Sequence, residues 1–410
     1  MVATEETVQS MIESTDDRNS AVILRKPARV ILLTAILATL PLAIPGISHV
    51  LGIKGASYRE MLPNLHQLIS FKGSQVNAES LPGATTPEIA ETPPADPPAG
   101  AGSIIDPTHT LDGFYASLAR TELKEPGAIT RITHYGDSPI TNDGITAPVR
   151  RLLQQRFGDA GHGFILLDRP WAWYGHQNIS FAPGGGWTND SIMNPMVKDG
   201  AFGLGGVDFR ANGAGRYTKF GPATDGDTGR NFSRMDVYYL REPNGGQFAA
   251  SVNDGVAQSI STASDSVESG FFEIDAPQQG ANSFEIKTTG GSVRMFGAVI
   301  ENDGPGVVYD SLGVNGAFAG LLATVMNEQH WTAQLQHRNP NLVILNYGTN
   351  ESQYAADDQM ARYERDLREV VRRVHTALPQ AAVLIVSPMD RGTNQGGRVT
   401  TLPSIPKIVE

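Results

Sequence analysis

The chain has 410 residues, of which 40% are hydrophobic, enough for about two to three domains at roughly 100–200 residues each. Its formal net charge of −11 and its sequence pI near 5.3 argue against nucleic acid as the main partner, because phosphate binding depends on clustered Lys and Arg. Cysteine is absent, which excludes disulfides, thiolate catalysis and zinc sites built on cysteine.

Residues 30–53 form an apolar run without a formal charge, long enough to cross a bilayer. Three basic residues closely precede it, so the positive-inside rule predicts that residues 1–29 are a cytoplasmic tail and that the rest is exported. A cleaved signal peptide and a buried helix are the alternatives. Two prolines interrupt the run, and no clear A-x-A cleavage site follows it. We therefore expect an uncleaved, single-pass transmembrane anchor.

A linker is expected over residues 54–110, outside the cytoplasm. Residues 82–107 are rich in Pro and Ala and cannot bury enough surface to fold, so they predict a semi-extended tether. A short amphipathic helix over 111–119 is expected to open the globular part.

Residues 111–204 and 303–410 carry alternating strand and helix signals. Buried strands are expected at 128–135, 341–347 and 382–388. The first two are followed by apolar residues at helical spacing, first Ile145, Val149, Leu152, Leu153 and Phe157, and later Met360, Tyr363, Leu367, Val370, Val371, Val374 and Leu378. Nearly continuous apolar strands separated by helices are typical of a parallel sheet covered on both faces. This pattern predicts an α/β fold with a doubly wound parallel sheet.

Residues 205–302 have a different pattern, with short strand signals separated by Gly-rich turns. Such spacing is typical of a β-sandwich, which we interpret as an insertion into the α/β domain. The strands are expected at 235–240, 246–252, 271–274, 283–287 and 293–300.

Polar motifs occur where two of the α/β strands end and just after the insertion. G-D-S (136–138) follows the first strand, Y-G-T-N-E (347–351) follows the second, and G-V-N-G-A (313–317) comes after the insertion. Ligands of open α/β sheets bind at the carboxyl ends of strands. Each motif alone is weak, since G-D-S occurs by chance in many proteins. Taken singly, the motifs do not decide whether Ser138 is a nucleophile or an ordinary loop serine.

The order of these motifs and the residues in and around them resemble the SGNH, or GDSL-type, hydrolases, over roughly residues 111–203 and 303–400. The stretches that carry the resemblance are H-Y-G-D-S-P, R-F-G-D-A-G-H-G-F, D-S-L-G-V-N-G-A and L-N-Y-G-T-N-E. The Y-G-T-N-E form with an inserted sandwich is similar to the branch that contains peptidoglycan O-acetylesterases. In that branch the inserted module is similar to carbohydrate-binding sandwiches.

The resemblance implies a role for each matching residue. Ser138 would be the nucleophile, and its own N–H, the N–H of Gly316 and the amide of Asn350 would form an oxyanion hole. Gly313 is the rival of Gly316, and Asp137 is expected to shape the turn. A tetrahedral oxyanion needs donors that are fixed in advance, and glycine lets a backbone N–H approach closely.

The expected general base is missing from the sequence. The family places a His near the C-terminal end of the domain, with an Asp three residues before it, but this chain has no D-x-x-H after residue 375. A serine hydroxyl needs an adjacent base to act as a nucleophile. We expect that the sequence is truncated at its C-terminus. The alternatives are loss of the base or substitution by another histidine.

The nine histidines have simpler expected roles. His134 is expected on the first strand, while His162 and His176 are candidates to line the cleft; the others are expected in apolar, linker, surface or packing positions: His49, His66, His109, His330, His337 and His375. No pair has the spacing of H-E-x-x-H and no glycine run joins a strand to a helix, so we expect no metal and no cofactor.

The most aromatic stretch is R-P-W-A-W-Y-G-H at 169–176. Trp171, Trp173 and Tyr174 are candidate substrate-binding residues that would stack on sugar rings, and the alternative is a hydrophobic plug beneath the insertion.

The resemblance therefore implies a serine esterase that removes O-acetyl groups from a cell-envelope or exported polysaccharide, with peptidoglycan as one candidate. A polysaccharide O-acetyltransferase and a non-catalytic, tethered polysaccharide-binding protein are the alternatives. The expected location is the bacterial inner membrane, with a cytoplasmic N-terminus and a periplasmic or extracellular catalytic domain. The sequence does not indicate an oligomeric state.

Overall fold

The computed structural model describes residues 104–409 except for 225, 278–279, 355 and 396–397. The expected tail, the anchor at 30–53 and nearly all of the linker lie outside the described residues. In the described part of the chain, no helix combines the length and apolar character needed to cross a membrane.

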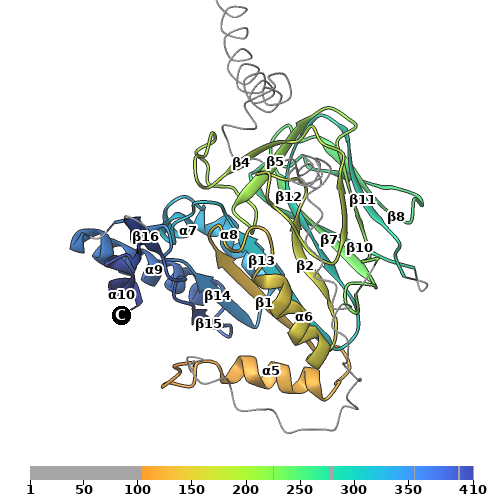
Figure 1. Ribbon diagram of the computed structural model, residues 1–410. Coiled ribbons are helices and arrows are strands. Elements are labelled where there is room, and N and C mark those ends of the chain that lie inside the picture. The colour runs from red at the N-terminus through yellow and green to blue at the C-terminus, as the bar shows by residue number, and fades with distance from the viewer. Residues whose placement is uncertain (1–103, 225, 278–279, 355, 396–397, 410) are drawn as a thin grey trace, which may run out of the picture. The chain divides into compact units, whose positions relative to one another are not determined.

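The α/β part contains a parallel four-stranded sheet with the strand order β13-β1-β14-β15 (Figure 1). Its strands are β1 (Ile129–Gly136), β13 (Gly306–Gly313), β14 (Leu342–Asn346) and β15 (Ala382–Ile385). The register pairs Gly136, the last residue of β1, with Gly313 on one side and Asn346 on the other. The carboxyl ends of β1, β13 and β14 therefore finish at the same level of one sheet edge.

Helices cover both faces of this sheet, as the sequence predicted. They are α5 (Asp112–Glu122), α6 (Thr146–Phe157), α8 (Glu328–Arg338) and α9 (Asp357–Ala377). Strand side chains alternate between two apolar clusters because successive residues point to opposite faces. One cluster joins the sheet to α5 and α6 through Phe114, Ile132, Phe157, Leu342 and Ile344. The other joins it to α8 and α9 through Trp331, Leu335, Val343, Leu345, Val370 and Val374.

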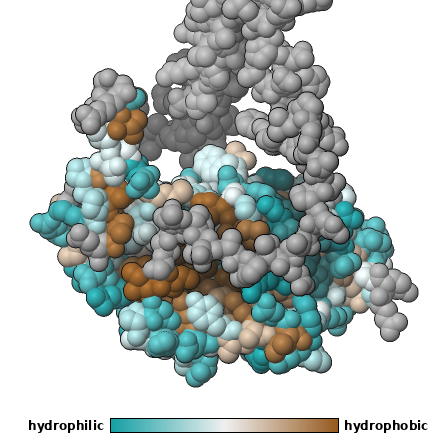
Figure 2. Space-filling view, turned by 60° about the horizontal axis from the view of Figure 1, so that its bottom comes forward, coloured by the Kyte–Doolittle hydropathy of each residue, from teal (hydrophilic) through white to brown (hydrophobic). Residues whose placement is uncertain are grey.

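Helix α6 buries a different face from the expected one. Phe157 is buried, but Val149 and Leu152 are exposed. The buried side of the helix instead carries Arg150, which pairs with the buried carboxylate of Asp143. Solvent-facing hydrophobic side chains also occur elsewhere, and Figure 2 shows apolar surface between hydrophilic side chains on the face that it presents.

The insertion is a β-sandwich made of two mostly antiparallel sheets. One has the order β10-β7-β12-β5-β4, with β2 also paired to β12, and the other has the order β3-β6-β11-β8-β9. Their bounds are β2 (Gly161–Leu166), β3 (Ser180–Pro183), β4 (Thr188–Ser191), β5 (Val207–Asn212), β6 (Tyr217–Gly221), β7 (Arg234–Arg241), β8 (Gln247–Val252), β9 (Gln258–Ser261), β10 (Glu268–Asp275), β11 (Phe284–Gly290) and β12 (Ser292–Glu301). All five predicted strands are present.

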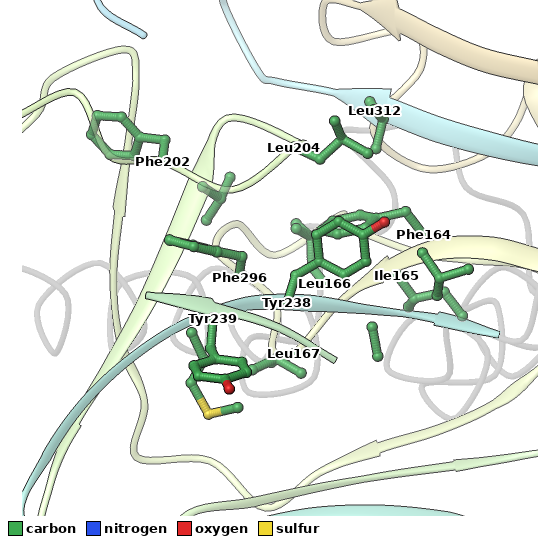
Figure 3. Packing of buried hydrophobic residues seen from close by; sticks show 14 of the residues in the cluster. Phe164, Ile165, Leu166, Leu167, Phe202, Leu204, Tyr238, Tyr239, Phe296 and Leu312 are labelled. Carbon is green, nitrogen blue, oxygen red and sulfur yellow. The ribbon is translucent and has the colours of Figure 1, made fainter. Parts of the chain in front are cut away.

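The expected boundary of the insertion at residue 205 was wrong. Strands β2, β3 and β4 precede it, yet all three belong to the sandwich sheets. Strand β2 is buried along its whole length, and Figure 3 shows its side chains Phe164, Ile165 and Leu166 beside Tyr238 of β7 and Leu312 of β13. The sandwich and the α8/α9 side of the α/β sheet therefore share one continuous core.

Buried charges also join the two parts. Arg338 of α8 donates to both oxygens of Asp310 on β13, at 2.9 and 3.0 Å, and to Glu301 on β12, at 2.6 Å. Glu301 also accepts bonds from Arg131 of β1 and Arg234 of β7. Burial opposes the ionisation of Glu301, but the guanidinium groups of Arg338 and Arg131 outweigh it and hold its pKa well below the usual range.

The remaining elements lie near the carboxyl ends of the parallel strands and beyond them. They are α7 (Gly320–Thr324), the 3₁₀ turn η1 (Glu351–Gln353), β16 (Gly392–Gln395), β17 (Arg398–Thr401) and α10 (Ser404–Val409). The loop after β13 leads into α7, and the loop after β14 leads into η1. Each loop therefore ends in a short helical segment.

Candidate active site

The three polar motifs meet at the carboxyl edge of the parallel sheet. The N–H of Val314, after β13, donates to the carbonyl of Gly136 at the end of β1 (3.0 Å). The side-chain amide of Asn350, after β14, donates to Ala317 O (2.9 Å) and to Asp137 Oδ2 (3.3 Å). Segments more than 200 residues apart in the sequence are thus in direct contact at one site.

Ser138 lies on the tight turn that follows β1. Its carbonyl accepts bonds from the N–H and the hydroxyl of Thr141, at 3.2 and 2.8 Å, and its side chain is partly buried. Gly136 lets the turn close, because a Cβ at that position would lie 2.5 Å from Ile140 Cγ1. Within the described residues, neither the hydroxyl nor the N–H of Ser138 donates a hydrogen bond.

The geometry favours Gly316 over Gly313 as the second backbone donor. Gly316 is the third residue of a turn closed by a bond from Ala317 N to Val314 O (3.1 Å), and its φ of +78° suits glycine there. Its N–H has no acceptor among the described atoms. Gly313 instead ends β13 and packs tightly, since a Cβ there would lie 2.6 Å from Thr141 N.

Asn350 uses both of its amide hydrogens inside the protein. The bond to Ala317 O is 2.9 Å long, and the contact with Asp137 Oδ2 is longer, at 3.3 Å. Hydrogen bonds weaken as they lengthen beyond about 3.0 Å. The hydrogen directed at Asp137 is therefore the one that a substrate oxygen could most readily take over.

Glu351 is a positioning residue to which the sequence analysis gave no role. Its buried carboxylate accepts the N–H of Ala319 (2.7 Å) and the N–H of Gly348 (3.1 Å), so one side chain fixes the loops that carry Gly316 and Asn350. Burial raises its pKa. The only sequence signal was its place as the last letter of Y-G-T-N-E. Its partners cannot be read from the sequence.

Asp137 is buried beside Asn350, and among the described residues it has no histidine partner. Burial raises its pKa to about 6, although a hydrogen bond from Thr349 and the charge of Arg391 oppose the shift. Arg391 also donates to Thr349 O (2.7 Å), which brings the loop after β15 to the same site. The expected turn-shaping role of Asp137 stays a prediction, and the structure shows its carboxylate in contact with the amide of Asn350.

The raised pKa of Asp137 predicts a measurable dependence of stability on pH. Between about pH 4 and pH 6 the folded protein binds more protons at Asp137 than the unfolded chain does, so this group makes the folded state less stable as the pH rises. Asp137→Asn removes that loss. We expect the change in Tm caused by the substitution to be more favourable at pH 7 than at pH 4.5, as measured by thermal unfolding. An equal change at both pH values would contradict the assignment.

The histidines within the described part of the chain do not hydrogen-bond to Ser138. His134 Nδ1 lies 2.7 Å from Tyr309 Oη, and burial lowers its pKa to about 4. His162 and His176 were candidates to line the cleft. Both are buried, and their ring centroids are 5.4 Å apart, so they pack against each other inside the protein. His330 and His337 contact Ser269 and Asp236, respectively. None of these contacts makes a described histidine the general base of Ser138.

The three candidate sugar-stacking residues have different environments. Trp173 is 53% exposed, whereas Trp171 is partly buried against the core. Tyr174 is 7% exposed and its hydroxyl accepts the N–H of Leu166 (2.9 Å). The prediction for Tyr174 is corrected, because its ring is packed and holds β2. No set of three potential metal-ligating side chains occurs among the described residues.

Comparison with known proteins supports the assignment of the fold. Residues 278–405, which include Gly316 and Asn350, match the model of the GDSL-like Lipase/Acylhydrolase family. No curated protein matches the chain. A structure titled "Peptidoglycan O-acetylesterase in action, 5 min" is similar, with a TM-score of 0.58 and 23% identity over 72% of this chain and 77% of that chain.

Two further matches have TM-scores too low to support an argument. A family two carbohydrate esterase from Cellvibrio japonicus has a TM-score of 0.20 and 10% identity over 56% of this chain and 82% of that chain. A carbohydrate binding module of family 29 has a TM-score of 0.21 and 10% identity over 35% of this chain and 89% of that chain. Residues 278–405 are thus similar to the GDSL-like lipase/acylhydrolase family, and the chain shares its fold with a peptidoglycan O-acetylesterase.

Proposed function

We propose that the protein is a serine esterase that removes O-acetyl groups from a cell-envelope or exported polysaccharide, with peptidoglycan as the first candidate. One observation carries the proposal: the loops of Ser138, Gly316 and Asn350 are in contact at one sheet edge of a GDSL-like domain. The fold likeness to a peptidoglycan O-acetylesterase supports the choice of substrate class.

In the proposed reaction, Ser138 Oγ attacks the carbonyl carbon of the acetyl ester. The C–O bond to the sugar then breaks, the sugar hydroxyl leaves with a proton, and an acetyl-enzyme remains. Water attacks this ester, releases acetate and restores the serine. The N–H groups of Ser138 and Gly316 and the amide of Asn350 would stabilise the oxyanion in both steps. A general base would take the proton of the Ser138 hydroxyl during the attack and give it to the departing sugar oxygen.

The proposal predicts that the full-length protein releases acetate from O-acetylated peptidoglycan. The control is the same material after mild alkali, which removes O-acetyl but leaves N-acetyl groups, and no acetate should then appear. Absence of acetate release, together with no hydrolysis of an aryl acetate, would contradict the proposal. Acetylated oligosaccharide formed from an aryl acetate without free acetate would contradict hydrolysis and support an acetyltransferase.

We also propose that residues 30–53 anchor the protein in a bacterial inner membrane and that the esterase domain lies outside the cytoplasm. The support is the uncharged apolar run and the basic residues that precede it.

A further inference from the structure

A cavity adjoins the candidate oxyanion loops, with a volume of about 260 Å³. It lies between the start of α7, the η1 turn and the first turns of α9. Phe318 and Tyr354 line it together with Gln359, Arg362 and Asp366. Phe318 is two residues beyond Gly316, and Glu351, which also lines the cavity, directly follows Asn350. The cavity is therefore built partly from the segments that carry the proposed oxyanion donors.

The aromatic side chains give this cavity an apolar wall that is open to solvent. The rings of Phe318 and Tyr354 are 6.3 Å apart between centroids and inclined by 35°. Tyr354 is 50% exposed, and Phe318 is partly buried. An exposed aromatic face can pack against the C–H face of a sugar ring, because it offers a large, rigid apolar surface with few rotatable bonds.

The polar side chains of the cavity suit a neutral ligand with many hydroxyl groups. Arg362 Nε lies 3.6 Å from Asp366 Oδ2, so the two opposite charges are neighbours. The carboxylate of Glu351 is already used by two backbone N–H groups. Gln359 adds an amide that can both donate and accept. The cavity thus offers both hydrogen-bond donors and acceptors. A strongly charged ligand would gain little electrostatic binding energy there, because the charges of Arg362 and Asp366 already offset each other.

We propose that this cavity, the Tyr354 subsite, binds one pyranose unit of the polysaccharide next to the unit whose ester is cleaved. Its volume is below the roughly 300–1,000 Å³ typical of pockets for drug-sized ligands, which fits a single ring better than a longer chain segment. The inference rests on the proposed function and deepens it by assigning residues that select a polymeric substrate over a small ester. Binding energy gained there would raise kcat/KM for the polymer.

The test compares two substrates in full-length Tyr354→Ala. We expect kcat/KM for O-acetylated glycan to fall about tenfold more than kcat/KM for an aryl acetate, which corresponds to about 1.4 kcal/mol. Tyr115→Ala is the matched control, because Tyr115 is 45% exposed on α5 and lies outside the residues that line the cavity. It should leave the ratio of the two rate constants unchanged.

Trp173→Ala separates this subsite from the other exposed aromatic candidate. A selective loss in Trp173→Ala with none in Tyr354→Ala would overturn the proposal, as would an equal loss on both substrates in Tyr354→Ala. Binding of a de-O-acetylated oligosaccharide, measured by calorimetry, gives a readout that does not need catalysis. Weaker binding by Tyr354→Ala supports the subsite even if wild-type hydrolysis fails, and unchanged binding contradicts it even if hydrolysis succeeds.

Discussion

Ser138→Ala is expected to lower kcat for ester hydrolysis on the order of 10⁶-fold. Removal of a serine nucleophile leaves only substrate binding and the oxyanion donors, which together supply roughly 10³–10⁴-fold over the uncatalysed reaction. The donors do not depend on the lost hydroxyl, because the turn is held by Thr141 and the Asn350 amide by Ala317 and Asp137. The variant should therefore fold normally while acetate release from an aryl acetate falls to background.

Ser264→Ala provides the control for this prediction. Ser264 lies in the sandwich, where its hydroxyl donates to Glu268 (2.8 Å). The substitution therefore also removes a serine hydroxyl, but at a position outside the proposed site. Its kcat should stay within about twofold of the wild type, since most surface substitutions have small effects. Retention of more than 1% of wild-type kcat in purified Ser138→Ala would exclude Ser138 as the nucleophile.

The sequence predicted the α/β part well because each signal was local. The buried strands near 129–136 and 342–346 and the helix near 357–377 are written in continuous apolar runs or in helical periodicity, and the structure confirms them. Helix α6 shows the limit of this approach. Its apolar spacing pointed to Leu152, but the ion pair between Arg150 and Asp143 is buried instead, and that partner is seven residues away.

The parts of the candidate site that the sequence could not predict depend on distant contacts. Glu351 fixes Ala319, 32 residues earlier, and Asn350 reaches Asp137, 213 residues earlier. Tyr174 was a candidate for sugar stacking because it is aromatic, yet its hydroxyl accepts a hydrogen bond from the backbone of β2 in the core. Residue type alone does not decide whether an aromatic ring packs or binds ligand, since both need the same apolar face.

Arg338→Leu is expected to reduce the free energy of unfolding by about 3–5 kcal/mol. The buried guanidinium is surrounded by carboxylates: it donates three bonds to Asp310 and one to Glu301. Leucine fills much of the same space but leaves Asp310 in the core without its main countercharge. The same side chain links α8 to both the parallel sheet and the sandwich. We therefore expect both parts to unfold together in one cooperative urea transition, and the lower free energy of unfolding to be measured from that transition.

An exposed arginine distinguishes burial from charge as the cause. Arg241 pairs with Glu268 at 2.9 Å, and both side chains are more than 40% exposed. Arg241→Leu should cost about 1 kcal/mol or less, because water already solvates both charges. If Arg338→Leu were no more destabilising than Arg241→Leu, the buried network would contribute little to holding the two parts together. In that case the shared apolar core around β2 would have to account for their union.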